Sequence, residues 1–415
     1  MKLLTLTLSL SMASLTIAQT TWYDIATPTN KKLLAIDFAS EQVGYIVGED
    51  STMLKSTDGG LNWNQVNYSG ITFYPGGEDI LNVKFVSEQI GYVTTGPYGG
   101  LFKTTDGGSN WTALTAAGTI CYNQAFYFSS EGNGFYGGSG CFQGEAIDQM
   151  SGGTFSSTTI NSPSSLASDY VRDIDFRGNL GMAVSASRFL RSTDGGANWD
   201  TLSSGTMNPL TSIKIINDTL VYAGYIDESS SFGLMKSVDA GLTWGTETSM
   251  ATFYYPDYHD VISADNGYLY SCGGSDFVTT GLIFEDKGQG WWYYDVDQTI
   301  YGMTNYKDSI VFGVGDSGYV VTNIDPQSLS INSNHENVEL KVYPNPTESI
   351  CFFEFSGINE STTLQLFDLQ GRLIRSYSTM PYQISMQDLP DGVYIIHIEG
   401  DSFSTSERLI KKGGF

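Results

Sequence analysis

Short stretches in which apolar and polar residues alternate recur along most of the chain. Residues 35–38, 44–48 and 53–56 form one such series, and residues 83–86 and 91–94 begin the next. Glycine-rich turns separate the stretches, and alternation with a period of two is the pattern of a strand with one buried face. About four short strands in each repeat of ~40–50 residues are typical of the blades of a β-propeller. The pattern therefore predicts an all-β chain built from propeller blades.

A short motif follows the third predicted strand in each series and reads Lys-Ser-Thr-Asp-Gly-Gly-Leu-Asn-Trp in its first copy. The copies, complete or decayed, lie at residues 55–63, 103–111, 150–155, 191–199, 236–244, 286–291 and 320–325. Seven periods fill residues 19–327, so we predict a seven-bladed β-propeller in this range. The last period lacks a fourth strand, and we expect residues 21–25 to supply it and to close the ring.

The repeated Ser/Thr-x-Asp-x-Gly-x-x-Trp pattern resembles the Asp box, also called the BNR repeat, which forms the turn between the third and fourth strands of a blade. Asp and Ser/Thr side chains bond backbone N–H groups in tight turns, and Trp buries a ring between neighbouring sheets. Side chains repeated around a ring cannot converge on one substrate, so we interpret them as structural and not as catalytic. They are Asp58, Trp63, Asp106, Trp111, Asp194, Trp199, Asp239, Trp244, Asp286 and Trp291.

The N-terminus has the pattern of a secretory signal peptide. Met1 and Lys2 precede an apolar stretch, residues 3–17, and small residues surround the expected cleavage site after Ala18. We therefore predict a signal peptide at residues 1–18. No later stretch approaches the ~20 apolar residues of a transmembrane helix, so no transmembrane anchor is expected.

The chain has four cysteines and three histidines. Cys121 and Cys141 lie in one repeat, where an oxidising compartment permits a disulfide between them, and two unbridged thiols are the alternative. Cys272 and Cys351 are expected to be buried thiols. The histidines share no metal-ligand spacing with each other or with the cysteines, so neither a metal site nor a cofactor is expected.

Acidic residues outnumber basic ones, 45 against 20, and the formal net charge is −25. A surface this negative repels a phosphate backbone, which argues against nucleic acid as a partner. A sialidase-like site would need three arginines from different blades to hold the substrate carboxylate. The propeller arginines all fall within one predicted blade, so sialidase activity is not expected. They are Arg172, Arg177, Arg188 and Arg191.

A glycoside hydrolase that works with two carboxylates remains an alternative, because acidic residues are frequent on the face opposite the Asp boxes, here called the top face. A solvated acidic surface is the simpler interpretation. The carboxylates expected there are Glu49, Asp50, Glu78, Asp79, Glu145, Asp169, Asp227, Glu228, Asp257, Asp260, Asp276 and Asp316.

Aromatic side chains are interleaved with these acids. They suit a sugar ring or a protein partner, and ordinary packing over the blade ends explains them equally well. If a ligand binds to the top face, we expect it near Tyr98, Phe142, Arg172, Tyr254, Tyr255, Tyr258 and His259.

Residues 19–327 as a whole resemble the single-ring propellers related to the photosystem II assembly and stability factor. The resemblance rests on phrases such as residues 40–48, which precede the Asp boxes. It implies a scaffold that binds proteins and lacks an enzyme site. The arginine-rich patch of the plastid relatives is absent from this sequence, so their partner is not carried over.

A polar linker, predicted at residues 328–337, leads into a segment of different composition. Residues 338–415 contain three ordered motifs and a basic end that resemble the C-terminal sorting domain of the type IX secretion pathway of Bacteroidetes. The matching residues are Pro344, Asn345, Pro346, Gly371, Gly392, Tyr394, Lys411 and Lys412. The resemblance implies recognition by the outer-membrane translocon and removal by its sorting peptidase. Alternating stretches predict about seven strands in a small Ig-like β-sandwich, and an ordinary binding sandwich is the alternative.

These observations together predict an exported, monomeric, non-enzymatic propeller that acts as a binding module or scaffold. The type IX pathway would deliver it to the outer cell surface or the medium, where an extracellular protein or glycan would be its ligand. A secreted glycoside hydrolase that uses top-face carboxylates is the alternative function.

Overall fold

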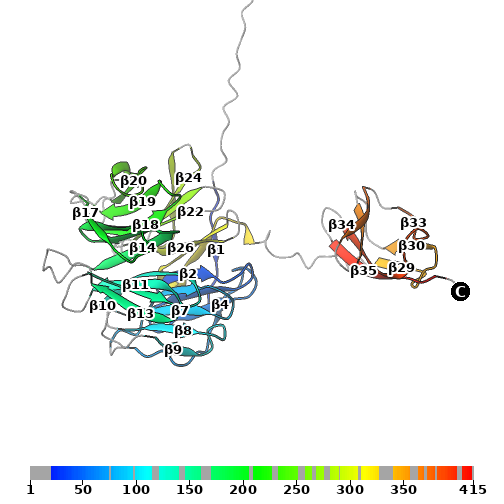
Figure 1. Cartoon of the computed structure of the whole chain (residues 1–415), viewed down its shortest axis with the longest axis horizontal. Helices are drawn as coiled ribbons and strands as arrows, with labels where there is room; N and C mark the ends of the chain where they lie inside the picture. The colour runs from blue at the N-terminus through cyan, green and yellow to red at the C-terminus, as the bar shows by residue number, and fades with distance from the viewer. Residues whose placement is uncertain are drawn as a thin grey trace, which may run out of the picture. The chain divides into compact units, whose positions relative to one another are not determined.

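The computed structural model of the chain forms two compact units, Met1–Leu329 and Ser330–Phe415, whose strands are shown in Figure 1. It describes residues 20–73, 76–96, 99–114, 121–139, 145–159, 170–204, 209–226, 232–250, 258–263, 268–274, 281–288, 290–306, 310–326, 340–355, 363–368, 372–378, 381–399 and 404–413. The predicted signal peptide and linker lie outside these residues. Within them the regular secondary structure consists of β-strands and one 3-10 turn, η1 (Asp316–Gly318). None of the described segments is a helix long and apolar enough to cross a membrane.

The first unit contains seven four-stranded antiparallel sheets among its described residues. The first three blades comprise β2–β5 (Leu33–Phe38, Gly44–Gly48, Met53–Ser56, Asn64–Gln65), β6–β9 (Ile80–Phe85, Gly91–Thr95, Leu101–Thr104, Trp111–Ala113) and β10–β13 (Cys121–Ser130, Asn133–Ser139, Glu145–Ser151, Thr154–Thr159). The next three comprise β14–β17 (Val171–Arg177, Leu180–Ser185, Arg188–Ser192, Asp200–Ser203), β18–β21 (Leu210–Ile215, Val221–Ile226, Phe232–Ser237, Gly245–Met250) and β22–β25 (Tyr258–Ser263, Leu269–Gly274, Gly281–Asp286, Trp291–Val296). The predicted seven-bladed all-β propeller is therefore confirmed.

The seventh blade combines the two ends of the repeat region. Its strands are β26 (Ile300–Tyr306), β27 (Ile310–Gly315), β28 (Val320–Thr322) and β1 (Tyr23–Ile25), with β1 on the outside. Strand β1 pairs antiparallel with β28, so that Asp24 lies opposite Val321. The first strand of each blade contacts the first strand of the next, and β26 contacts β2, which closes the ring.

The hydrophobic core of this unit lies between neighbouring blades. Met182 and Val184 of the fourth blade, for example, pack with Leu210 and Ile213 of the fifth. Second strands such as β3 and β7 are buried at every residue, because each sheet has another sheet on both of its faces. Each large apolar side chain buried in this way contributes about 1.5–3 kcal/mol. Stability is therefore distributed around the ring and has no single centre.

The second unit is a small β-sandwich of two sheets, as the sequence predicts. One sheet contains β29 (Leu340–Tyr343), β30 (Ile350–Phe355) and β33 (Gln383–Ser385), and the other contains β32 (Leu373–Tyr377), β31 (Thr363–Asp368), β34 (Gly392–Glu399) and β35 (Ser404–Lys411). Phe353 of the first sheet and Leu364, Ile396 and Leu409 of the second share one buried cluster. The two sheets therefore enclose a core that belongs to this unit alone.

Candidate binding surfaces and structural sites

The first Asp box is a turn in which side chains replace missing backbone partners. The Ser56 hydroxyl donates to Asp58 Oδ1 (2.8 Å) and accepts the N–H of Gly60 (2.9 Å). The Asn62 backbone N–H and side-chain amide donate to the two Asp58 carboxylate oxygens at 3.0 and 2.7 Å. Gly60 has a φ of 90°, and a Cβ there would lie 2.7 Å from the Phe312 ring of the seventh blade. Only glycine fits this turn and its approach to the neighbouring blade.

The same bonds recur at Asp106, Asp194 and Asp239, which with Asp58 are called the rim aspartates below. Their Oδ2 atoms accept hydrogen bonds at 2.6–2.7 Å from the side chains of the residues four positions later. These side-chain bonds, followed by backbone N–H donors, lower the pKa of Asp106, Asp194 and Asp239 to about 2. Both carboxylate oxygens are thus engaged within the turn.

The fifth copy keeps the turn with fewer bonds. Phe284 stands where the other boxes have Ser or Thr, and Asp286 Oδ1 accepts the N–H groups of Gly288 (2.8 Å) and Gly290 (3.1 Å). The turn survives because the carboxylate alone can cap two backbone donors.

The tryptophans of the boxes pack against aromatic side chains. Trp63 and Trp111 are each 4% exposed. The indole N–H of Trp111 donates to the Gly108 carbonyl oxygen (3.0 Å), and Trp244 stacks on Phe189 of the preceding blade with ring centroids 4.1 Å apart. The box therefore anchors the outer strand and also contacts the neighbouring sheet.

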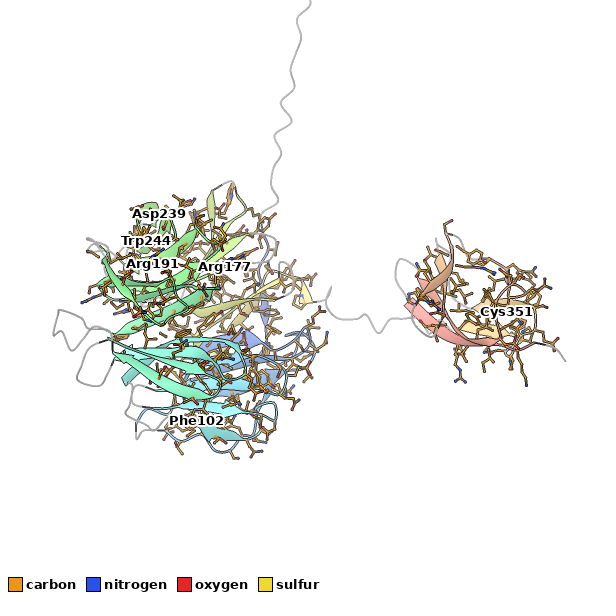
Figure 2. The ribbon with its side chains drawn as sticks, viewed as in Figure 1. Phe102, Arg177, Arg191, Asp239, Trp244 and Cys351 are labelled. Carbon is orange, nitrogen blue, oxygen red and sulfur yellow. The ribbon has the colours of Figure 1, made fainter. Side chains whose placement is uncertain are left out.

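Polar side chains of one blade also reach the Asp-box turn of the next. Arg191 Nε donates to the Ala240 carbonyl oxygen (2.7 Å), and Figure 2 shows Arg191 beside the labelled Asp239 and Trp244. The Tyr45 hydroxyl donates to the Gly107 carbonyl oxygen in the same sense (2.9 Å). The turns are thus tied into the ring as well as into their own blade.

A second group of aspartates lies on the first, innermost strands of the blades, and we call them the inner aspartates. Asp37 Oδ2 accepts the N–H of Phe85 in the next blade (2.7 Å), and Lys84 Nζ lies 2.7 Å from Asp37 Oδ1. Asp175 Oδ2 likewise accepts the N–H of Ile215 in the next blade (2.8 Å). Each carboxylate supplies a bond that the neighbouring inner strand would otherwise lack.

The inner aspartates of the fourth and sixth blades follow the same rule. Asp173 Oδ2 accepts the Ile213 N–H (2.8 Å), and Asp260 Oδ2 accepts the Met303 N–H (3.1 Å). Burial, reinforced by the charge of Asp260, raises the pKa of Asp173 to about 7, and burial also raises the pKa of Asp260. Asp260 was expected on a top-face loop; that expectation is wrong, because it lies within β22 and bridges two blades. In the sequence, an aspartate between two apolar residues of a blade's first strand, as in residues 36–38, is the signal for an inner aspartate.

On the top face, the described carboxylates of the first blade pair with lysines, and Asp316 of the seventh blade pairs with a tyrosine. Lys31 pairs with Asp50, and Lys32 Nζ lies 3.9 Å from Glu49 Oε1. Burial raises the pKa of Glu49, Lys32 opposes the shift, and the nearby charge of Asp79 adds to it. The Tyr301 hydroxyl donates to Asp316 Oδ2 (3.0 Å). This part of the face is therefore a mixed surface of acids, lysines and a tyrosine.

The predicted ligand residues are only partly described. Arg172 belongs to β14, and its guanidinium carbon lies 4.9 Å from the centre of the Tyr170 ring. Tyr258 and His259 belong to β22. The others, Tyr98, Phe142, Tyr254 and Tyr255, lie outside the described residues.

The cysteines, too, are only partly described by the structure. Cys121 begins β10, but its side chain and Cys141 lie outside the described part of the chain, so the proposed bridge stays a prediction. Cys272 and Cys351 are buried free thiols, as expected, and burial raises the pKa of Cys351 to about 11. Among the described side chains, no group of three or more His, Cys, Asp or Glu residues is arranged to hold a metal ion.

In the second unit, sorting-motif residues far apart in the sequence meet. The side-chain amide of Asn345 donates to the Arg408 carbonyl oxygen (2.6 Å), and its Oδ1 accepts the Ile410 N–H (2.9 Å). Lys411 Nζ lies 3.0 Å from Asp391 Oδ1, beside Gly392 at the start of β34.

Other motif residues have separate positions. The Tyr394 hydroxyl donates to the Pro390 carbonyl oxygen (2.8 Å), and Lys412 is exposed. Pro344 and Pro346 flank Asn345, and Gly371 lies outside the described residues. The first motif and the basic end thus form one bonded region of the sandwich.

The outer part of the sixth blade carries a group of polar and aromatic residues that no sequence motif predicts. Glu285 is buried and accepts hydrogen bonds from the Thr20 hydroxyl (2.8 Å) and the Tyr294 hydroxyl (2.7 Å), while Lys287 Nζ lies 3.1 Å from it. Thr20, Glu285 and Lys287 border a hollow of about 510 Å³ next to the N-terminal segment. A second hollow, of about 550 Å³, follows strand β25, and consecutive Trp and Tyr residues are its only signal in the sequence.

The arrangement of strands defines the class of protein, a seven-bladed β-propeller followed by a β-sandwich. Residues 15–118 match the family model of the photosynthesis system II assembly factor YCF48. Residues 341–412 match the model of the secretion system C-terminal sorting domain. Both resemblances expected from the sequence are confirmed, and the sorting domain implies interaction with a secretion machinery. No curated protein matches the chain.

Solved structures share the fold at low sequence identity. A structure of YCF48 bound to D1 peptide is 17% identical, with a TM-score of 0.56, over 74% of this chain and 98% of that one. YCF48 from Cyanidioschyzon merolae is 16% identical, with a TM-score of 0.55, over 72% and 98%. An ancestral GH74 enzyme is 12% identical, with a TM-score of 0.56, over 94% of this chain and 64% of its own. At such identities the likeness concerns the fold alone.

Proposed function

We propose that the chain is an exported propeller that binds an extracellular protein or glycan and performs no chemistry on it. The sorting-domain match over residues 341–412 carries the export part of the proposal. The pairing of Asn345 with the strand that ends at Lys411 supports it, because it holds the exposed Asn345 of the first motif beside the basic C-terminal end. We expect the signal peptide to act before the sorting domain is recognised, and a sorting peptidase to remove the sorting domain afterwards.

The binding part of the proposal rests on how the described aspartates are used. The rim aspartates give both carboxylate oxygens to their own turns, and the inner aspartates accept backbone N–H groups of neighbouring blades. A general acid or base needs a carboxyl group that can reach a substrate proton. The YCF48 structure with a bound D1 peptide shows that another propeller of this fold accepts a peptide ligand.

Export is tested by deleting residues 338–415 in a bacterium with a type IX pathway. We expect the propeller to stay in the periplasm, and normal surface delivery would refute the proposal. Asn345→Ala, which removes two bonds between the first motif and the C-terminal strand, should reduce delivery. Leu373→Ala, at an exposed position of the same sandwich, is the control and should leave delivery unchanged.

A secreted glycoside hydrolase is the second candidate, and the GH74 enzyme among the structural neighbours favours it. The full chain would be applied to a glycan array and then assayed for release of reducing sugar. We expect binding without release. If reducing sugar is released, and Glu49→Gln or Asp316→Asn abolishes the release, the chain is a hydrolase and the binding-only proposal is wrong.

A further inference from the structure

Among the strands that the structure describes, β25 is the outer strand of the sixth blade and pairs only with β24. Its sequence from Trp291 to Val296 is Trp-Trp-Tyr-Tyr-Asp-Val, and it pairs with β24 in a regular register without a bulge. Natural edge strands are usually short, twisted by a bulge, or blunted by Lys or Pro, because an open edge is a template for another strand. None of these devices is present in β25.

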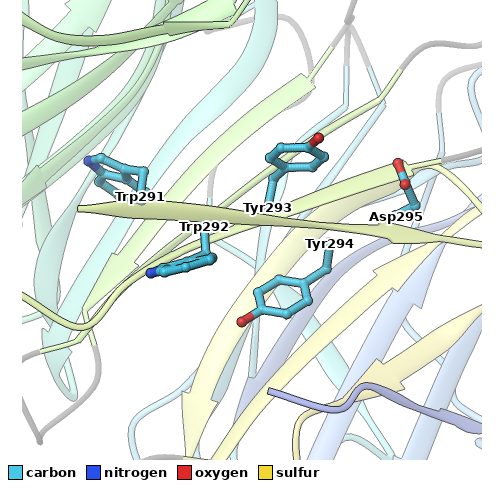
Figure 3. A pocket seen from close by; sticks show the side chains of 5 residues that line it. All are labelled: Trp291, Trp292, Tyr293, Tyr294 and Asp295. Carbon is cyan, nitrogen blue, oxygen red and sulfur yellow. The ribbon is translucent and has the colours of Figure 1, made fainter. Parts of the chain in front are cut away.

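Aromatic rings flank this edge on both sides. Figure 3 shows Trp292 and Tyr294 on one side of the strand and Trp291, Tyr293 and Asp295 on the other. Trp292 is 54% exposed and Tyr293 is 64% exposed. The hollow of about 550 Å³ is lined by these five consecutive residues, so it runs along the strand and does not sink into the blade.

The rings of Trp291 and Tyr294, on either side of the exposed Trp292 and Tyr293 in the sequence, are held in place by contacts. The Tyr294 hydroxyl donates to Glu285 Oε2 at 2.7 Å, and Trp291 makes an edge-to-face contact with Tyr222 of the fifth blade. The exposed side chains therefore stand on a strand whose neighbouring positions are anchored, which lowers the entropy lost when a partner binds.

Other outer strands within the described residues differ from β25. Strands β5, β9 and β1 have two or three residues, and β17 reads Asp-Thr-Leu-Ser. Strand β21 is as long as β25, but its pairing with β20 has a register shift and its sequence contains no aromatic residue. Strand β13 is as long and as regularly paired as β25, but its sequence is Thr-Phe-Ser-Ser-Thr-Thr. Among these strands, only β25 combines length and regularity with consecutive aromatic residues.

We propose that β25 takes up an extended peptide segment of a partner protein as a fifth strand of the sixth blade. This inference rests on the proposed binding function and names the kind of ligand and its site. Backbone pairing supplies affinity in such complexes, and side-chain contacts at alternate positions supply specificity. An extended peptide sends alternate side chains to the two faces of the sheet, where Trp292 and Tyr293 would each contact apolar residues.

Charge defines the partner further. Asp295 lies on the same side of β25 as Tyr293, and the chain carries a net charge of −25. A basic residue opposite Asp295 is favoured, and a second copy of this acidic chain is disfavoured by like-charge repulsion. The expected segment therefore carries apolar side chains on both faces, opposite Trp292 and Tyr293, and contains Lys or Arg.

The test uses the full chain as bait for a displayed library of random peptides of about ten residues, the upper length of an ordinary strand. Counter-selection uses the Trp292→Ser/Tyr293→Ser double variant. We expect enrichment of peptides that combine neighbouring apolar residues with Lys or Arg and that slow hydrogen exchange at the amides of residues 291–296. Trp292→Ser should weaken their binding about tenfold or more.

A modified peptide and further variants distinguish backbone pairing along β25 from a nonspecific hydrophobic contact. A selected peptide methylated at alternate amide nitrogens, and therefore unable to pair along one edge, should lose binding. Asp295→Asn should reduce the preference for basic over neutral peptides. Leu242→Ser removes an apolar side chain that is 56% exposed in another blade and should change nothing. Unchanged thermal unfolding of the Trp292→Ser variant would show that the propeller itself is still folded.

Failure to enrich any peptide, binding that tolerates amide methylation, or protection of amides outside β25 would overturn the inference. Peptides that bind only to the top face would overturn it and leave the proposed function standing. Glycan hydrolysis or normal delivery without the sorting domain would overturn the proposed function and leave peptide uptake by β25 to be judged on its own data.

Discussion

The rim aspartates and the inner aspartates stabilise the same ring in opposite electrostatic environments. Asp194, at the rim, accepts hydrogen bonds from its own turn, and its pKa falls to about 2. Asp173, on an inner strand, is enclosed by neighbouring blades, and its pKa rises to about 7. At Asp194 local N–H and amide donors outweigh the loss of water, and at Asp173 burial outweighs the backbone donors. The comparison teaches that one residue type can serve the fold through a local turn or through a bridge between blades.

The largest effect is expected from the anchor of a rim turn. Trp111→Ala removes a ring that is 4% exposed and should lower the free energy of unfolding by about 3–5 kcal/mol. Trp292→Ala, at an exposed position, is the matched control and should stay within about 0.5 kcal/mol. Chemical denaturation measures both changes. Equal losses would show that the rim turns are not anchored by their tryptophans.

A smaller effect is expected from the bridge between the first two blades. Asp37→Ala leaves the Phe85 N–H without its acceptor and Lys84 without its partner, and should cost about 1–3 kcal/mol. Asp218→Ala, whose side chain is 95% exposed beside Arg177, should cost little. If denaturation shows the two variants to be alike, the inner aspartates do not bridge the blades.

Asp173 and Asp194 should also respond to pH with opposite signs. The folded-state pKa of Asp173 is about 7, above the ordinary value of about 3.9, so the folded state holds this proton more tightly. Raising the pH from about 4 to about 7 should therefore lower stability, and Asp173→Asn should reduce this decline by a few degrees in melting temperature. Asp260, Asp175 and Lys214 are the charged groups that act on Asp173 or share its surroundings. Identical melting profiles in wild type and variant between these pH values would contradict this view.

The smallest effect is expected at a single rim aspartate in acid. The folded-state pKa of Asp194 is about 2, below its ordinary value, so its contribution is complete above about 4 and is lost as the pH falls toward 2. Asp194→Asn should lower the melting temperature at neutral pH and show a weaker further loss in acid. Melting curves at several acidic pH values test this. An acid response as steep as that of the wild type would exclude Asp194 as its source.

The sequence by itself determined the repeat, the number of blades and the chemistry of the rim turns, since all of these depend on residues close together in the chain. The five residues from Asp58 to Asn62 that form a turn, for example, are read directly from their order. The same holds for the sorting domain, whose motifs have a fixed order along residues 338–415.

The tertiary structure alone decided which acids bridge blades and which aromatic rings meet solvent. Asp260 has an ordinary acidic context in the sequence, yet the neighbouring β26 makes it a bonded inner aspartate. Trp291 and Trp292 are adjacent and identical in type, but Trp291 contacts Tyr222 of the fifth blade while Trp292 is 54% exposed. Adjacent residues of a strand face opposite sides of the sheet, and only the placement of the next blade determines which side is covered.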